Sequence, residues 1–185
     1  MKRLVLALAL LLPAELPAAG PDNAASADAL LAAKAEWLGH ITRFVLWPDS
    51  AFASAEAPFR LCLAGAESFA APLAFLRGQT VAGRRLQIET VHSVAELARC
   101  QIAYFGSAAD EALRTSAQDG RLPKLLGVAG DARFTEQGGT LALVTEGGPI
   151  RLHVNFASVR ASRLQFSAKL LELAHVQHPA PLKSG

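Results

Sequence analysis

The sequence predicts a single three-layer α/β domain, in which helices cover both faces of a mostly parallel sheet and an antiparallel hairpin lies near the C-terminus. Short apolar runs alternate with segments whose apolar residues recur every three or four positions, which is typical of strand–helix–strand units. Two strand-like runs near the C-terminus are joined by a Gly-rich turn, which indicates antiparallel pairing. The 185 residues are 51% hydrophobic and 18% charged, which suits one sizeable core.

The N-terminus has the pattern of a secretory signal peptide. Lys2 and Arg3 precede an apolar run from Leu4 to Leu12, and small residues follow. The run is too short to span a bilayer as a helix. We therefore expect residues 1–27 to be a signal peptide and the mature chain to be exported in soluble form. The candidate cleavage points are the small residues at 18–19 and 25–27.

The first helix is expected over residues about 26 to 45, because apolar residues recur there at three- and four-residue spacings. Its apolar positions are Leu30, Leu31, Trp37, Leu38, Ile41, Phe44 and Val45. The other face is predicted to carry Lys34, Glu36, His40 and Arg43. Pro48 disfavours a helical Trp47 and ends the helix.

The rest of the chain is predicted from the same two periodicities. Strands are expected at 59–64, 86–91, 101–105, 125–128, 140–145 and 150–155. Helices are expected at 67–77, 94–97 and 108–117, and from Ser167 to about Val176. Ser107 and Ser167 are the predicted N-caps of the last two of these helices. The segment 178–185 contains two prolines and is expected to be a flexible tail.

The chain has two cysteines, Cys62 and Cys100. In an exported protein a single pair is expected to form a disulfide. We favour this reading over a Cys–His nucleophile built from His92 and Cys100. A bridge between the first and third strands makes them neighbours, which the 2-1-3-4 order of doubly wound sheets satisfies.

No catalytic motif is visible in the sequence, which lacks GxSxG, P-loop, GxGxxG and HExxH patterns. We expect no enzyme activity, no cofactor and no metal site. Nucleic-acid binding is not expected either, because the net charge is +2 and the basic residues are scattered rather than gathered on one face.

Two groups of residues are candidates for binding. Arg43, Trp47 and Phe52 lie where the first helix ends, and their types suit a protein–protein surface. Packing alone is the competing explanation for Trp47. The second group, Arg151, His153 and Asn155, shares one face of a predicted strand. These residues either face solvent or line a polar site for a small molecule.

An ordered set of residues, spread over roughly positions 30 to 177, resembles the YfiR family of bacterial periplasmic proteins. The set comprises Lys34-Ala35, Arg43-Phe44-Val45, Trp47-Pro48, Phe59, Leu61-Cys62-Leu63, Gly65, Gly78, Gly83-Arg84, Cys100, Phe134, Gly138-Gly139, Asn155 and Ser167-Ala-Lys-Leu-Leu171. The resemblance implies that residues 28–177 form one YfiR-like domain located in the periplasm.

The resemblance also implies a function that composition does not show. YfiR-like proteins bind the periplasmic part of an inner-membrane diguanylate cyclase and hold it inactive, which lowers cyclic di-GMP signalling and restrains biofilm formation. A homodimer and an outer-membrane lipoprotein that draws the regulator away are implied as well. Cys62 and Cys100 match the family's disulfide positions, whereas a second cysteine pair of some relatives is missing here. The alternative is a periplasmic small-molecule-binding domain.

Overall fold

The computed structural model describes residues 21–122, 124–145 and 148–177. Its helices are α1 (Pro21–Phe44), α2 (Val94–Leu97), α3 (Glu111–Gln118), α4 (Arg133–Glu136), α5 (Phe156–Ser162), α6 (Ala168–Leu173) and the short 3-10 helices η1 (Asp49–Ala51), η2 (Glu67–Phe69) and η3 (Ala74–Leu76). Its strands are β1 (Val45–Leu46), β2 (Phe59–Ala64), β3 (Thr80–Val81), β4 (Arg84–Thr90), β5 (Ile102–Phe105), β6 (Leu126–Ala129), β7 (Leu141–Val144), β8 (Arg151–Asn155), β9 (Gln165–Phe166) and β10 (Ala174–Gln177).

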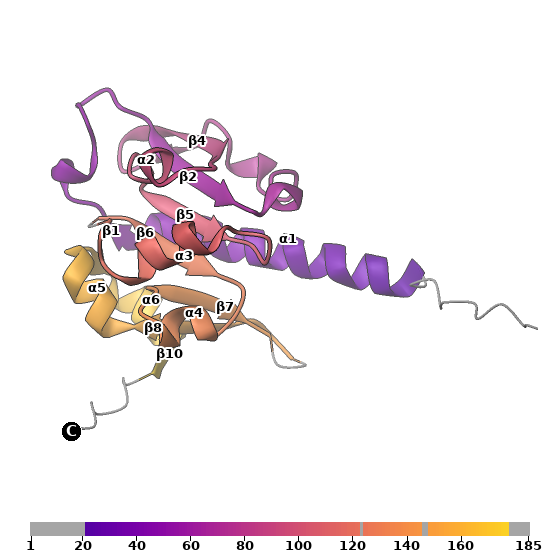
Figure 1. Cartoon of the computed structure of the whole chain (residues 1–185). Helices are drawn as coiled ribbons and strands as arrows, with labels where there is room; N and C mark the ends of the chain where they lie inside the picture. The colour runs from indigo at the N-terminus through magenta and orange to yellow at the C-terminus, as the bar shows by residue number, and fades with distance from the viewer. Residues whose placement is uncertain (1–20, 123, 146–147, 178–185) are drawn as a thin grey trace, which may run out of the picture.

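The main sheet has eight strands in the order β10-β8-β7-β6-β5-β2-β4-β3, and β1 pairs with β9 in a separate two-stranded sheet (Figure 1). The run β4-β2-β5-β6-β7 is parallel throughout. Its first four strands stand in the predicted 2-1-3-4 order, so that prediction is confirmed. The predicted hairpin is confirmed too, because β7 and β8 pair antiparallel.

Side chains alternate between the two faces of the sheet and build one core on each side. On one face, Leu61 and Leu63 of β2 and Tyr104 of β5 belong to the core that packs against α1, α5 and α6. On the other face, Cys62 and Phe105 belong to the core beneath α2, α3 and α4. The three-layer α/β architecture expected from the sequence is therefore confirmed.

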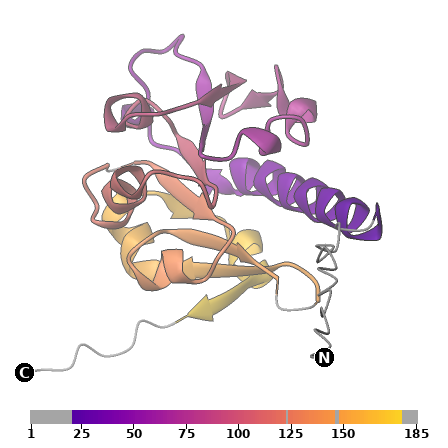
Figure 2. The same ribbon diagram turned by 45° about the vertical axis from the view of Figure 1, so that its right-hand side comes forward.

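Helix α1 begins at Pro21, five residues before the predicted start, and ends at Phe44. Figures 1 and 2 show it as a long rod whose first turns project past the other elements. Leu38 and Ile41 are fully buried, as predicted. Lys34 was expected on the polar face but is only 8% exposed. Its position explains this difference, because it lies four residues from both Leu30 and Leu38, on the buried side of the helix.

Two further helix predictions are wrong in detail. The segment 67–77 forms the 3-10 helices η2 and η3 instead of one helix, because Pro72 between them lacks the amide donor that an α-helix needs. The helix predicted from 108 begins at Glu111, and Asp110 rather than Ser107 caps it by accepting a hydrogen bond from the Ala112 amide at 2.7 Å.

The last helix is shorter than predicted. Ser167 caps α6 as expected, its side chain accepting a hydrogen bond from the amide of Leu170. The helix ends at Leu173, however, and residues 174–177 form β10, which pairs in parallel with β8. The backbone partners that β8 offers at the sheet edge account for the change from helix to strand.

The predicted tail at 178–185 and residues 1–20 of the predicted signal peptide lie outside the described residues, so both stay predictions. Residues 21–27 form the first turns of α1. Within the part of the chain that the structure describes, none of the helices combines the length and apolar character needed to cross a membrane.

Candidate partner-binding surface and polar cavity

The apolar residues around the end of α1 that are exposed or only partly buried include Leu46, Trp47, Phe52 and Phe166, here called the α1-end surface, and Arg43 lies on the last turn of the helix before them. Strand β1 leaves the helix directly and pairs with β9, so that Val45 is opposite Phe166 and Leu46 is opposite Gln165. The Val45 side chain is buried, whereas Leu46 is 60% exposed, the most exposed large apolar side chain among the described residues. Alternation along β1 therefore directs one apolar residue inward and one to the surface.

Two of the predicted partner-binding residues meet on one buried ring. Trp47 contacts Phe59 edge-on with ring centroids 5.1 Å apart, and Phe52 contacts the same ring at 6.4 Å. Phe59 itself is fully buried. The guanidinium of Arg84 lies 3.8 Å above the Phe52 ring, a cation–π geometry. Trp47 and Phe52 are thus anchored to the core while part of each remains accessible.

Arg43, the third predicted partner-binding residue, is exposed on the last turn of α1. Its guanidinium donates a hydrogen bond to Gln79 Oε1 at 2.8 Å, and the Gln79 amide donates to the Phe75 carbonyl. The Arg43 side chain is therefore held by the segment after η3, not by the aromatic pair. An exposed arginine beside apolar residues suits the rim of an interface.

The indole nitrogen of Trp47 is unusual. Among the described residues it is the one buried side-chain nitrogen or oxygen without a hydrogen-bond partner. An unsatisfied buried donor costs about 1–3 kcal/mol. Packing explains why the Trp47 ring lies against Phe59, but it does not explain the choice of a side chain with an N–H over phenylalanine.

The loop that carries Phe52 is fixed by hydrogen bonds to its backbone. Arg84 Nη1 donates to the carbonyls of Ser54, Ala55 and Ala57 at 2.7, 2.8 and 2.8 Å. The side-chain Nε2 of Gln101 donates to Ala51 O at 2.7 Å. Because the loop is held in one conformation, a partner that binds there pays little additional ordering entropy.

The disulfide joins Cys62 of β2 to Cys100, which precedes β5, with the two Cα atoms 6.0 Å apart. The predicted bridge is thus present, and it lies under α2 and α3 in the second core. Both sulfurs are used by the bridge, so neither is available as a nucleophile to His92.

The three residues of the predicted polar site lie on β8 with different surroundings. Arg151 is exposed and His153 is buried. Asn155 caps α5, because its Oδ1 accepts hydrogen bonds from the amides of Ala157 and Ser158 at 3.1 and 3.3 Å. Its Nδ2 donates to Thr135 O at 2.9 Å. Of the three, only Asn155 lines one of the described cavities.

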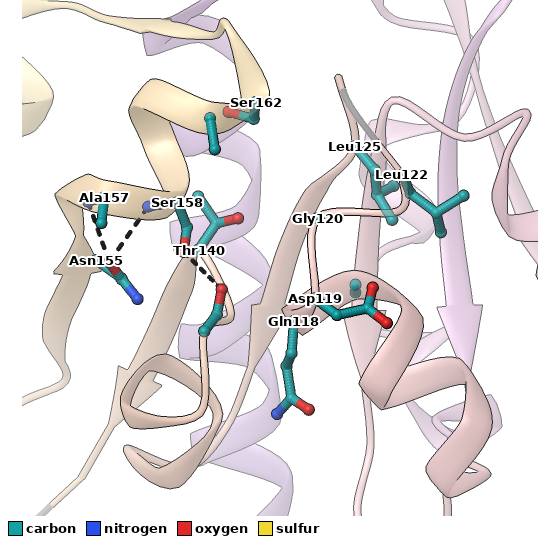
Figure 3. Close-up of a pocket in the computed structure, with 13 residues that line it drawn as sticks. Gln118, Asp119, Gly120, Leu122, Leu125, Thr140, Asn155, Ala157, Ser158 and Ser162 are labelled. Atoms are coloured by element: carbon teal, nitrogen blue, oxygen red, sulfur yellow. Dashed lines mark hydrogen bonds between the residues drawn. The ribbon is translucent and has the colours of Figure 1, made fainter.

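That cavity has a volume of about 320 Å³ and lies between α5 and the segment that links α3 to β6. Figure 3 shows Asn155, Ser158 and Thr140 on one side and Gly120, Leu122 and Leu125 on the other. The Ser158 hydroxyl donates to the Gly138 carbonyl, so its hydrogen is already used. The lining combines apolar walls and polar groups with one carboxylate, Asp119, which is paired with Arg121 at 2.7 Å, so the cavity suits a small, largely uncharged molecule.

No cluster of three or more histidine, cysteine or acidic side chains suitable for a metal ion exists among the described residues. The pKa of Glu96 is lowered, and the capping box of α2 explains the shift. The backbone amides of His92 and Ser93 and the Ser93 side chain donate hydrogen bonds to its carboxylate. This shift therefore belongs to helix capping.

The surface and the cavity are the two candidate recognition features of this α/β domain. The described residues present a partly exposed apolar–aromatic surface, with the Arg84 guanidinium over one of its rings, and a cavity lined by apolar and polar groups.

The family model described as YfiR/HmsC-like matches residues 31–175, so the chain belongs to the YfiR/HmsC-like family. The family resemblance seen in the sequence is thereby confirmed. Proteins of this family are periplasmic and regulatory rather than catalytic. Among curated proteins, none matches the chain in sequence.

Proposed function

We propose that this protein is exported to the periplasm, where it binds the periplasmic part of an inner-membrane diguanylate cyclase and inhibits it. Family membership supports the regulatory role. The observation that carries the proposed binding mode is the α1-end surface, in which Leu46 is 60% exposed next to the anchored rings of Trp47 and Phe52. Aromatic and aliphatic anchors with an arginine at the rim are the usual components of a protein interface.

The inhibition follows from a difference in affinity. A regulator that binds the inactive conformation of the cyclase more tightly than the active one shifts the population toward the inactive state. The shift is limited by the ratio of the two affinities, and no chemical step by the regulator is needed. Cyclic di-GMP production then falls because a smaller fraction of the cyclase is active.

The binding experiment compares two exposed apolar residues on different parts of the molecule. Leu46→Asp alters the α1-end surface, and Val94→Asp is the matched control, because Val94 is also an exposed apolar residue, at 39%, but lies on α2. Neither change places a charge in the core. Binding to the purified periplasmic part of the cyclase is measured by calorimetry.

We expect Leu46→Asp to weaken binding tenfold or more and Val94→Asp to leave it nearly unchanged, since burying an unpaired carboxylate at an interface centre is costly. Equal affinities of the two variants would show that the α1-end surface does not contact the cyclase. Trp47→Phe keeps an aromatic ring against Phe59 and removes an N–H that is fully covered, so its affinity should stay close to that of the wild type.

Two accompanying proposals concern assembly. We infer a homodimer, because the family resemblance implies one and an exposed apolar surface can also be covered by a second copy. We further propose that an outer-membrane lipoprotein releases the cyclase by competing for this regulator. Sedimentation of the purified chain over a concentration series tests the dimer, and addition of the lipoprotein to the preformed complex tests the competition.

A second candidate function is small-molecule binding, which the cavity of Figure 3 favours. Thr140 is only 3% exposed and lines this cavity, and no hydrogen bond joins its hydroxyl to another described residue. A bound molecule offering one acceptor or donor there would satisfy it. Thr140→Val would abolish such binding and leave binding to the cyclase unchanged.

A further inference from the structure

A buried lysine lies apart from the surfaces described above. Lys34, in the middle of α1, is 8% exposed. No hydrogen bond or salt bridge connects its ammonium group to another described residue. Lysine is almost never buried unless it is paired, because removal of its charge from water is costly. The lysine therefore needs an explanation other than the packing of α1.

The phenol of Tyr104 has the same property and lies at the same place. Tyr104 is 6% exposed, packs on Phe69 with ring centroids 4.5 Å apart, and makes no hydrogen bond from its hydroxyl to another described residue. A Cβ atom placed on Gly130 would lie 2.9 Å from Tyr104 Oη and 3.0 Å from Lys34 Nζ. Two donors without a partner among the described residues thus lie against the backbone of Gly130.

Both donors retain access to solvent. In the described part of the chain, Trp47 Nε1 is the one side-chain polar atom that is both fully covered and without a hydrogen-bond partner. Since Lys34 Nζ and Tyr104 Oη also have no such partner, neither of them is fully covered. Gly130 lines an open cavity of about 660 Å³ together with Ser107, Arg114, Asp131 and Arg133. Lys34 and Tyr104 are not among its lining residues, and Gly130 is the residue that connects the cavity to the two donors.

The cavity lies where parallel α/β sheets usually bind ligands. Strands β5 and β6 are parallel neighbours, with Phe105 opposite Ala129. Gly130 directly follows β6, and Ser107 follows β5 by two residues. The carboxyl ends of both strands therefore open into the cavity, which is the end of the sheet at which doubly wound folds bind small molecules, and the point where the strand order reverses is one strand away, between β2 and β5. The cavity of Figure 3 lies at the opposite ends of these strands, near Leu125 and Thr140.

The charges around Gly130 favour an anion. Asp131 is the nearest acid, and both its oxygens already have donors: Oδ2 binds Arg114 at 3.0 Å, and Oδ1 accepts from the Phe134 amide at 3.2 Å. Burial lowers the pKa of Lys34, while the charge of Asp131 acts in the opposite direction. The cavity lining itself is balanced, with Arg114 and Arg133 against Asp131 and Glu111, and Lys34, beside Gly130, is the cation added to it.

We propose that Lys34, Tyr104 and Gly130 form a binding site for a small oxyanion, the carboxylate or phosphate group of a small molecule, at the carboxyl ends of β5 and β6. The ammonium supplies a charge-assisted hydrogen bond and the phenol a second donor, and both require an acceptor. The glycine lets the ligand reach them. This site is independent of the proposed inhibition of a cyclase.

The test uses Lys34→Met, which keeps the apolar stem and removes the charge, and Lys169→Met, an exposed lysine of α6, as the control. Sodium phosphate and sodium succinate are titrated by calorimetry into each protein, with sodium chloride at equal ionic strength as the reference. Tyr104→Phe is the third variant. Binding of succinate alone indicates a carboxylate ligand, of phosphate alone a phosphate ligand, and of both a general oxyanion site.

We expect the wild type and Lys169→Met to bind at least one probe equally well, and Lys34→Met to bind it at least tenfold more weakly. Tyr104→Phe should bind severalfold more weakly. In anion-free buffer Lys34→Met should melt at a higher temperature than the wild type, because a poorly solvated ammonium without a partner among the described residues is replaced by an apolar group. The proposal is overturned if neither probe binds beyond the chloride reference, or if Lys34→Met binds as tightly as the wild type. A lower melting temperature for Lys34→Met would also overturn it, by showing that the ammonium stabilises the fold.

Discussion

Removal of the Cys62–Cys100 disulfide is expected to lower the free energy of unfolding by about 4 kcal/mol. The cysteines are 38 positions apart in the sequence, so the bridge closes a loop of about 39 residues, for which the chain-entropy relation gives this value. Cys62 is 0% and Cys100 is 5% exposed, so alanine at both positions exposes almost no new surface in the folded state. Stabilities of single domains are about 5–15 kcal/mol, so the loss is a large share of the total.

Urea unfolding, followed by circular dichroism, measures this loss in the double variant Cys62→Ala/Cys100→Ala and in the wild type with and without reductant. With a denaturant slope of about 2 kcal/mol per molar urea, the midpoint should fall by about 2 M. The reduced wild type separates loss of the cross-link from loss of the two sulfurs. A decrease smaller than about 1 kcal/mol, or rapid thiol labelling of the native protein, would refute the reasoning.

Three further predictions concern single residues. Gly65 has φ +56°, and a Cβ there would overlap the main chain of Ala109. Gly65→Ala should therefore lower the free energy of unfolding, measured in urea, by about 3 kcal/mol. An unchanged free energy of unfolding would contradict the geometry. Tyr104 is the single tyrosine of the chain, and burial raises its pKa to about 12, so the tyrosinate absorbance should appear near that pH in the folded protein. Because the pKa of Tyr104 is higher in the folded than in the unfolded protein, its contribution to stability is complete below pH 10.0 and is lost as the pH rises through about 12. A tyrosinate titration midpoint near pH 10.0 in the folded protein would contradict this prediction. Arg84→Met removes three hydrogen bonds to the loop and the cation above the Phe52 ring. Limited proteolysis should therefore cut between residues 52 and 58 several times faster than in the wild type. An equal rate of cleavage would show that other contacts hold the loop.

The sheet could be predicted from the sequence because its determinants are local. The alternation of Phe59, Leu61 and Leu63 marks β2 over the residues that form it, and the cysteine pair predicts that β2 and β5 are neighbours. The cap Ser167 was also readable, since its side chain accepts a hydrogen bond from the amide three residues on.

The errors arise where distant contacts decide the structure. Residues 174–177 continue the apolar spacing of α6, and only their pairing with β8 makes them a strand. Pro72 was a visible signal against one helix over 67–77, and its missing amide explains the break.

The candidate site was only partly readable. Trp47 and Phe52 were singled out by type and position, yet their shared contact with Phe59 required the fold. Leu46, the most exposed large apolar residue of the α1-end surface, was missed, because a two-residue strand carries too little periodicity to show which side chain faces outward. Lys34 was placed on the wrong face, although its spacing from Leu30 and Leu38 indicates burial.

The most direct measurement of the proposed function is the cellular level of cyclic di-GMP in one strain with and without this gene, complemented by the wild type, Leu46→Asp or Val94→Asp. The proposal predicts that deletion raises the level and that the wild type and Val94→Asp restore it, whereas Leu46→Asp fails to do so at equal protein abundance. An unchanged level on deletion would contradict the assignment as an inhibitor of a diguanylate cyclase.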